Sequence, residues 1–426
     1  MKVLALRPSG EIVGEVRAPP SKSYTHRALF VASLAVGESV VTNPLVSRDT
    51  TATFGAIKGF GADLELLEGF AIVEGREPRV PEDVINALNS GTTLRIATAV
   101  GSLVKEGYSV LTGDDSLRRR PMQPLLDALS QLGVEAWSTR RNGCAPVVVR
   151  GRGSLQGYCR LRGDVSSQFL SALAIAGSAS EGETEVEVVG ELVSRPYVSA
   201  TIETIRAFGG LVSFDGRRLI AGGRGVRRGK FNVPGDYGLA AFVMVVPVLL
   251  GGSVRVTGID PTLPQADATI VDVLERMGAR VKHGEGYVET FGSTLEGIEV
   301  DLRDAPDLLP VVAILGLFAE GSTTIRGVKH ARYKESDRLA VLSEELKKVG
   351  AVIEEFEDGL SIANGTIKEA VLNPRDDHRL FMAFAVLSAA THGKIKTLGV
   401  ESVDVSYPNF LRDIISLGCE VLEFGR

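Results

Sequence analysis

One pair of short patterns recurs six times along the chain, at intervals of roughly 70 residues. The first pattern is a glycine followed by a short β-like run, as in the stretches that begin at Gly37, Gly107 and Gly252. The second is a glycine that ends a helical stretch and precedes a hairpin-like run, as at Gly61 and Gly350. A fixed period is the signature of one structural unit used repeatedly. We therefore predict a six-fold internal repeat that fills the chain.

The elements follow the same predicted order in each repeat. A helix such as SYTHRALFVASLAVG is apolar nearly all round, so we expect it to be buried. A glycine-started strand and a polar loop follow, and an amphipathic helix then ends at the second glycine, where a helix C-cap belongs. A β-hairpin closes the repeat. The pattern predicts an α/β protein whose unit is α-β-α-β-β with a linking strand.

Composition narrows the class of protein. A length of 426 residues favours two domains, and a net charge of −6 argues against nucleic acid or an anionic membrane as a partner. The three cysteines lack the spacing of a zinc site or a disulfide framework, which favours a reducing compartment. We find no signal peptide and no apolar run long enough to cross a bilayer. We therefore expect a cytoplasmic monomer without a metal site.

Polar residues that suit helix N-caps precede each of the six buried helices. Several helix N-termini aimed at one place would offer an anion free N–H groups and partial positive charge. The same loops carry more basic residues than capping needs: Lys22, Arg27, Arg95, Arg118, Arg119, Arg120, Arg195, Lys334, Arg338 and Arg379. In an acidic protein this set indicates an anion site, for example for phosphates. Capping with solvated charges is the alternative at any single position.

Eight motifs occur in order along nearly the whole chain: PSKSYTHRALFVASLA, NSGTTLR, RRRPMQPLLDAL, DVSSQFLSAL, LVSRPYV, PDLLP, KESDRL and DHRLFMAFA. Together they resemble the EPSP synthase (3-phosphoshikimate 1-carboxyvinyltransferase) family of enolpyruvyl transferases. The resemblance implies two domains, each of three copies of a βαβαββ unit, with the active site in the cleft between them. One domain would span residues 20–234, and the other would combine residues 1–19 with 235–426.

The resemblance also implies a reaction of the shikimate pathway, which leads to chorismate and the aromatic amino acids. The 5-hydroxyl of shikimate 3-phosphate attacks C2 of phosphoenolpyruvate, C3 gains a proton, and a tetrahedral intermediate loses phosphate. This chemistry needs positioned charge, a base and an acid, and it needs no metal and no redox cofactor. Both substrates are anionic, which accounts for basic loops in a chain of negative net charge.

Matching motif positions carry the family's site residues over to this chain. The positions for shikimate 3-phosphate are Lys22, Ser23, Arg27, Ser166, Ser167, Gln168, Ser194, Tyr197, Asp307 and Lys334. The positions for phosphoenolpyruvate are Lys22, Gly91, Arg120, Gln168, Arg338 and Arg379. The catalytic positions are Asp307 as the base on the 5-hydroxyl, Glu335 as the acid toward C3, His378 as support for the leaving phosphate, and Lys22.

Three positions depart from the family pattern. His330 stands where the family has an Asn, Val405 where it has a Lys that contacts phosphoenolpyruvate, and Ile96 where it has a Pro. None of these changes removes the implied acid or base, but each bears on ligand affinity.

Two other functions remain as alternatives. The sister enzyme that adds enolpyruvate to UDP-N-acetylglucosamine uses a Cys in the loop that corresponds here to Leu111–Arg120, and this loop has no Cys. A non-catalytic repeat scaffold would have no need for matched acids and bases. On that reading Asp307 is only an N-cap, and Glu335 with Arg338 is an exposed helix pair.

Overall fold

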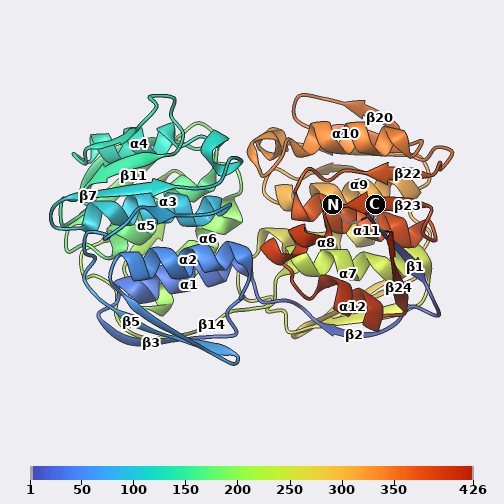
Figure 1. Ribbon diagram of the computed structural model, residues 1–426, viewed down its shortest axis with the longest axis horizontal. Helices are drawn as coiled ribbons and strands as arrows, with labels where there is room; N and C mark the ends of the chain where they lie inside the picture. The colour runs from blue at the N-terminus through green and yellow to red at the C-terminus, as the bar shows by residue number, and fades with distance from the viewer. Residues whose placement is uncertain (1–2, 425–426) are drawn as a thin grey trace. The chain divides into compact units, whose positions relative to one another are not determined.

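The computed structural model describes residues 3–424, which form two compact units. The inserted unit spans Pro20–Pro234, and the terminal unit joins the segment that ends at Pro19 to the chain from Gly235 onward (Figure 1). Within the terminal unit, the Asp236 N–H donates to the Pro19 carbonyl over 2.8 Å. Within the inserted unit, the Ser21 N–H donates to the Pro234 carbonyl over 2.7 Å. These bonds hold together the two chain segments at which each unit begins and ends.

The described chain contains six four-stranded sheets, three in each unit. Those of the inserted unit are β14 (Lys230–Asn232), β3 (Gly37–Thr42), β5 (Phe70–Gly75), β4 (Asp63–Leu67); β6 (Ile85–Asn86), β7 (Tyr108–Thr112), β9 (Val147–Arg150), β8 (Ala136–Ser138); and β10 (Gly157–Arg162), β11 (Glu183–Val189), β13 (Arg218–Gly222), β12 (Val212–Phe214). Those of the terminal unit are β16 (Val281–Gly284), β17 (Tyr287–Phe291), β15 (Ser253–Thr257), β2 (Val13–Arg17); β18 (Glu299–Asp301), β19 (Ser322–Arg326), β21 (Leu360–Ala363), β20 (Val352–Glu355); and β22 (Ala370–Leu372), β23 (Ile395–Leu398), β1 (Val3–Pro8), β24 (Cys419–Phe424).

All six sheets share one pairing pattern. A glycine-started strand pairs in parallel with an edge strand on one side and antiparallel with a hairpin strand on the other, as β3 does with β14 and β5. Alternate residues of each strand face the helices, so that Ala71 and Val73 of β5 are fully buried while their neighbours are partly exposed. The predicted α/β class and the six-fold repeat are confirmed.

Three apolar helices form the core of each unit. They are α1 (Lys22–Leu34), α3 (Gly91–Val100) and α5 (Ser167–Ser178) in the inserted unit, and α7 (Tyr237–Leu250), α9 (Leu309–Phe318) and α11 (His378–Ala390) in the terminal unit. The three helices of each set contact one another (Figure 1). The amphipathic helices are α2 (Arg48–Gly59), α4 (Gln123–Gln131), α6 (Arg195–Ala207), α8 (Ile270–Arg276), α10 (Arg338–Lys348) and α12 (Phe410–Ser416). No helix among residues 3–424 has the length and apolar character that crossing a membrane requires.

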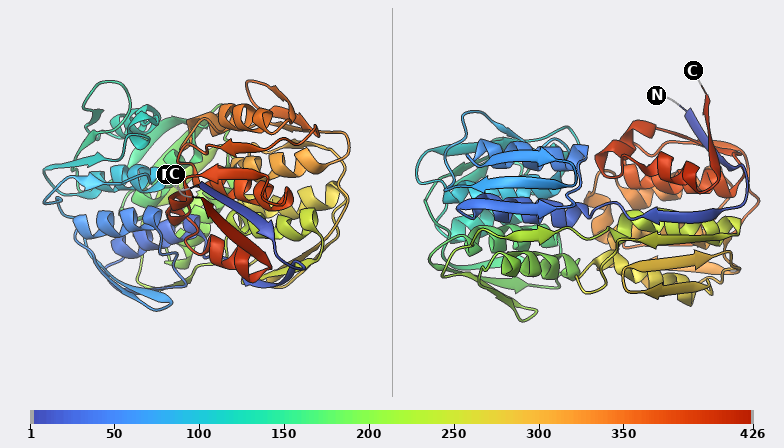
Figure 2. Two further views of the ribbon diagram at one scale, coloured as in Figure 1. Left: turned by 45° about the vertical axis from the view of Figure 1, so that its right-hand side comes forward. Right: turned by 90° about the horizontal axis from the view of Figure 1, so that it is seen from below.

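Strands β1, β2 and β14 complete three repeats from distant parts of the chain, and β14 supplies the parallel edge strand of β3. Strand β1 pairs with β24 in antiparallel register, from Val3 opposite Phe424 to Pro8 opposite Cys419. Figure 2 (right) shows the dark-blue β1 running beside the red β24. Strand β2 likewise supplies the parallel edge strand of β15. A strict order of repeats along the sequence therefore does not describe how the sheets are assembled.

The predicted N-caps are confirmed at four of the six buried helices. Side-chain oxygens of Ser90, Ser166, Asp236 and Asp377 accept backbone N–H groups at the starts of α3, α5, α7 and α11. Ser21 stands at the cap position of α1 without a side-chain cap bond. Asp307 is not a cap, because it lies inside the 3₁₀ turn η4 (Pro306–Leu308) that leads into α9.

Candidate active site

The N-terminal turns of the three core helices of the terminal unit meet at Arg379. This residue lies in the first turn of α11, and its Nη1 donates to the Gly238 carbonyl of α7 over 3.1 Å. Its Nη2 lies 3.1 Å from Oδ2 of Asp307, just before α9. The side chain of Arg379 is only 3 % exposed. The repeat thus brings three helix ends to one place, and the binding of an anion there stays a prediction.

Arg338 organises the acidic groups of the same region. Its Nη1 lies 2.7 Å from Asp307, its Nη2 2.8 Å from Glu335, and its Nε 2.8 Å from Asp377. Its side chain is 1 % exposed, so the Glu335–Arg338 pair is buried, and the reading as an exposed helix pair is wrong. Burial alone would lower the pKa of Arg338, but the three surrounding carboxylates outweigh it and raise the pKa well above its ordinary value. Arg338 is therefore a permanent cation that fixes both the predicted base, Asp307, and the predicted acid, Glu335.

Three further titratable groups surround Asp307. Lys334 follows the turn η5 (Lys329–Tyr333), and its Nζ lies 3.4 Å from Oδ1 of Asp307. Burial lowers the pKa of Lys334, against the opposing effect of Asp307. Burial and the nearby Lys334 lower the pKa of His330 to about 4, which keeps that ring neutral. Burial also raises the pKa of Asp267 to about 7, even though Arg379 opposes the shift.

His378 precedes Arg379 in the first turn of α11, and its side chain is fully buried. The expected support for a leaving phosphate stays a prediction for this residue.

In the inserted unit, residues predicted to bind phosphoenolpyruvate gather at the start of α3. A Cβ atom added to Gly91 would lie 2.5 Å from Nη1 of Arg95, 3.2 Å from Nη1 of Arg120 and 3.5 Å from Oε1 of Gln168. A side chain at this position would therefore displace the end of the Arg95 side chain. Arg95 donates to Gln168 over 2.7 Å, and Arg120 donates to Asn89 over 3.0 Å. Two arginines and an amide therefore surround one glycine backbone.

Lys22 begins α1 and is paired with a residue that the sequence analysis did not identify. Its Nζ lies 2.8 Å from Oδ2 of Asp49 in the first turn of α2, and both side chains are largely buried. Burial by itself would raise the pKa of the Asp49 carboxyl, but the Lys22 ammonium outweighs this and holds the pKa well below its ordinary value. The pair therefore carries both charges at neutral pH.

Residues predicted to bind shikimate 3-phosphate form a second group of the inserted unit. Arg27 donates to the Ser23 carbonyl over 2.8 Å, to the Tyr197 carbonyl over 3.1 Å and to the Thr201 hydroxyl over 2.8 Å. Its guanidinium lies 5.9 Å from the centroid of the Tyr197 ring. Burial lowers the pKa of Arg27 to about 10, which still leaves it charged at neutral pH. Arg27 thus links α1 to the N-terminal part of α6.

Two serine positions of the inserted unit stand at helix starts. Ser166 caps α5 and accepts from the Gln168 N–H over 3.3 Å, and Ser167 is the first residue of that helix. Ser194 precedes α6 with φ 56° and ψ 42°, the left-handed region that serine seldom adopts. The predicted contact of Ser194 with shikimate 3-phosphate stays a prediction.

Two departures from the family pattern are buried. Ile96 is fully buried in α3 and belongs to the helical core. Val405 ends the turn η6 (Val400–Val405) and is 8 % exposed. Arg118, one of the basic loop residues, donates to the Gly113 carbonyl and pairs with Asp115.

The sequence analysis did not identify Asp49. It treated Arg95 only as a basic residue and Asp377 only as a helix cap. The sequence does contain a signal for Asp49, because this carboxylate follows a polar loop and falls in the first turn of an amphipathic helix. Nothing in the sequence says that this turn lies beside Lys22, which is 27 positions earlier. The double role of Asp377, which caps α11 and binds Arg338, likewise needs the tertiary structure.

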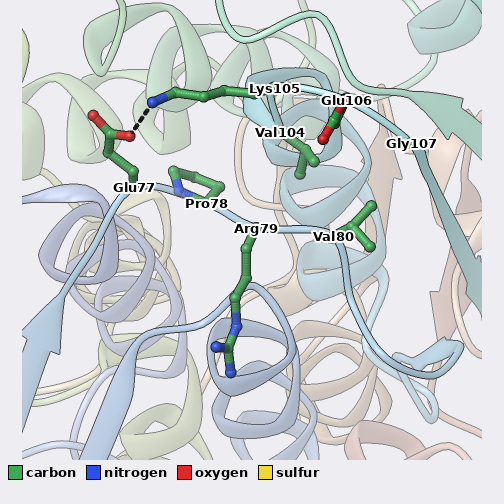
Figure 3. Close-up of a pocket in the computed structure, with 8 residues that line it drawn as sticks. All are labelled: Glu77, Pro78, Arg79, Val80, Val104, Lys105, Glu106 and Gly107. Atoms are coloured by element: carbon green, nitrogen blue, oxygen red, sulfur yellow. Dashed lines mark hydrogen bonds and ion pairs between the residues drawn. The ribbon is translucent and has the colours of Figure 1, made fainter.

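A pocket of about 750 Å³ lies elsewhere on the inserted unit, lined by Glu77, Pro78, Arg79, Val80, Val104, Lys105, Glu106 and Gly107. Figure 3 shows the Glu77–Lys105 ion pair, 2.5 Å long, at one side of this pocket. Both side chains are exposed, so the pair contributes little to stability. None of the lining residues is a predicted site residue.

The arrangement suits acid–base chemistry on anionic ligands. The terminal unit holds two carboxylates, Asp307 and Glu335, on one buried arginine. In the inserted unit, Lys22, Arg27, Arg95 and Arg120 accompany the single carboxylate of Asp49 in the groups described above.

Comparison with known proteins agrees with this chemistry. The family model described as EPSP synthase (3-phosphoshikimate 1-carboxyvinyltransferase) matches residues 6–414. The 3-phosphoshikimate 1-carboxyvinyltransferase of Korarchaeum cryptofilum is 44 % identical over 98 % of this chain and 99 % of the relative, and that of Halobacterium salinarum is 45 % identical over 96 % and 97 %. The EPSP synthase structure from Acinetobacter baumannii has a TM-score of 0.82 at 28 % identity and covers 99 % of this chain and 100 % of that one. This chain belongs to the EPSP synthase family.

Proposed function

We propose that this chain transfers the enolpyruvyl group of phosphoenolpyruvate to the 5-hydroxyl of shikimate 3-phosphate, with Asp307 and Glu335 as base and acid. The observation that carries the assignment is the Arg338 guanidinium, which holds both carboxylates within 2.8 Å in a buried position. Two acidic groups fixed on one cation keep a constant separation, which proton transfer at two neighbouring substrate atoms requires.

In the addition step, Asp307 takes the proton of the 5-hydroxyl while that oxygen bonds to C2 of phosphoenolpyruvate. Glu335 reacts from its protonated form: its carboxyl proton goes to C3, so that no carbanion is formed, and the resulting carboxylate stays paired with Arg338. Asp307 has three cations within 3.4 Å, Arg338, Arg379 and Lys334, and these favour its ionised form. An ionised carboxylate can accept the hydroxyl proton, and the same cations bind anionic ligand groups.

In the elimination step, the Glu335 carboxylate takes a proton back from C3, and phosphate leaves with the electron pair of its bond to C2, which restores the carbon–carbon double bond. The departing phosphate needs cations near it. Lys22, Arg120, Arg338 and Arg379 are the proposed groups for phosphoenolpyruvate and its phosphate. Arginine forks bind carboxylate and phosphate oxygens in pairs, which fixes orientation as well as charge.

Shikimate 3-phosphate is assigned to Ser23, Arg27, Tyr197, the Ser166–Gln168 turn and Ser194. Support comes from the start of α5, where Ser166 and Ser167 offer hydroxyl groups beside helix N–H groups. The rigid placement of Arg27 by three protein acceptors supports it as well, because a fixed cation loses little freedom on binding. A cytoplasmic location and a monomeric state stay predictions.

The test is a coupled phosphate-release assay of the purified chain with phosphoenolpyruvate and either shikimate 3-phosphate or UDP-N-acetylglucosamine. We expect phosphate release with shikimate 3-phosphate alone. Release with the nucleotide sugar would favour the sister reaction, and release with neither would favour a binding scaffold. When the assay is repeated with Asp307→Ala and Glu335→Ala, Asp301→Asn is the matched control, because Asp301 is a partly exposed carboxylate of the terminal unit that pairs with Arg303.

A further inference from the structure

A buried row of polar side chains crosses the core of the inserted unit between Lys22 and the start of α3. His26 lies one turn after Lys22 on α1, and its Nδ1 is 2.7 Å from the hydroxyl of Thr53 on α2. The Thr53 hydroxyl is 2.7 Å from that of Thr93 on α3. Thr93 in turn donates to the Ser90 hydroxyl over 2.8 Å. His26, Thr53 and Thr93 are fully buried, and Ser90 is 1 % exposed.

The direction of this row follows from the number of hydrogens. Each hydroxyl has one hydrogen to donate. Thr93 gives its hydrogen to Ser90, so Thr53 must donate to Thr93, and the Thr53 oxygen must then accept from Nδ1 of His26. The neutral ring therefore carries its hydrogen on Nδ1. The other ring nitrogen, Nε2, lies 3.8 Å from Oδ2 of Asp49, beyond hydrogen-bond length.

Each end of the row lies beside a residue assigned above to phosphoenolpyruvate, Lys22 at one end and Gly91 at the other. At one end, the His26 ring packs against the Asp49 carboxylate that binds Lys22. At the other end, the Ser90 oxygen accepts the Thr93 N–H over 3.2 Å and caps α3, next to Gly91. Hydroxyls inside an apolar core cost free energy unless they are paired, so a row in which each hydroxyl has a hydrogen-bond partner favours one arrangement of the three helices.

We propose that His26, Thr53 and Thr93 are positioning residues, which fix the start of α3 relative to the Lys22–Asp49 pair and so set the geometry of the phosphoenolpyruvate end of the site. The proposal rests on the function proposed above. It assigns these three residues no contact with substrate. The row joins α1, α2 and α3 by side chains alone, so removing one hydroxyl uncouples the helix ends without removing a ligand-binding group.

The kinetic test uses Thr53→Val, which keeps the side-chain shape and breaks two bonds of the row. Thr98→Val is the matched control, because Thr98 is fully buried on α3 and its hydroxyl donates only within that helix, to Leu94 over 2.6 Å. We expect Thr53→Val to raise KM for phosphoenolpyruvate about tenfold over the Thr98→Val value, as loss of one or two paired hydroxyls implies. KM for shikimate 3-phosphate should stay within about twofold, and Thr53→Ser should restore the wild-type values. Equal KM values in Thr53→Val and Thr98→Val would overturn the proposal.

A second measurement does not depend on activity. In ¹⁵N-histidine-labelled full-length protein, the His26 signals are identified by their loss in His26→Gln. We expect a hydrogen on Nδ1 and none on Nε2 in the wild type, and a change of this state in Thr53→Val but not in Thr98→Val. A wild-type ring with its hydrogen on Nε2 would refute the row. If the wild type lacked transferase activity, the proposed function would fail, while these spectra would still decide whether the row exists.

Discussion

Replacing Asp49 by Asn tests how strongly the buried ion pair with Lys22 stabilises the inserted unit. The substitution keeps the side-chain shape and removes one charge from a contact of 2.8 Å. At an effective dielectric constant of about 20, two charges at this distance attract by about 6 kcal/mol. Removing one partner of a buried pair costs about 3–5 kcal/mol in measured cases. Since the Lys22 side chain is 14 % exposed and can regain some water, we expect a loss of about 3 kcal/mol.

Thermal unfolding of the full-length protein measures this loss. For a unit of this size, 1 kcal/mol shifts Tm by about 2–4 °C, so Asp49→Asn should lower Tm by about 6–12 °C at pH 7. Asp63→Asn is the matched control in the same unit, because Asp63 pairs with Arg76 at 2.5 Å with both side chains more than half exposed. Exposed pairs contribute at most about 1 kcal/mol. Equal Tm values for the two variants would refute the reasoning.

The pH dependence of the Tm difference between wild type and Asp49→Asn gives a stricter check. The folded pKa of Asp49 lies below its unfolded value, so its contribution is complete above the unfolded pKa of about 3.9 and is lost as pH falls through the folded pKa. The Tm difference between wild type and Asp49→Asn should therefore be constant from pH 8 to 5 and should narrow below about pH 4. A difference that grows on acidification would contradict the ionised state assigned to Asp49.

Three further outcomes are expected. Asp307→Ala and Glu335→Ala should each lower kcat by about 10²-fold or more while calorimetric binding of shikimate 3-phosphate persists, and near-normal turnover in either would contradict its role. Val405→Lys should lower KM for phosphoenolpyruvate by about ten- to a hundredfold if the new ammonium reaches the ligand, and an unchanged KM would show that it does not. Asp267 has a folded pKa of about 7, above its unfolded value, so its burial destabilises the protein increasingly from about pH 4 to 7. Asp267→Asn should therefore gain Tm relative to wild type as pH rises over that range, and a gain independent of pH would argue against a neutral Asp267.

The sequence determined the repeating architecture because the evidence for it is local. The glycines that begin strands and end helices recur with a fixed spacing, and positions such as Gly37 and Gly61 adopt positive φ, which explains their identity. Helices apolar on every face had to be buried, and the structure places α5 and α9 in the cores of their units. The motifs likewise sufficed to predict the family, since a motif is a local string of residues.

Pairings between distant segments were decided only by the tertiary structure. The completion of the last sheet by β1 follows from strand pairing between opposite ends of the chain, which no local pattern encodes. The same holds for Asp49 beside Lys22, for Arg338 between Asp307, Glu335 and Asp377, and for the hydroxyl row from His26 to Ser90. A side chain's charge state and hydrogen-bond direction depend on burial and on neighbours within a few ångströms, and those neighbours are set by how the helices pack.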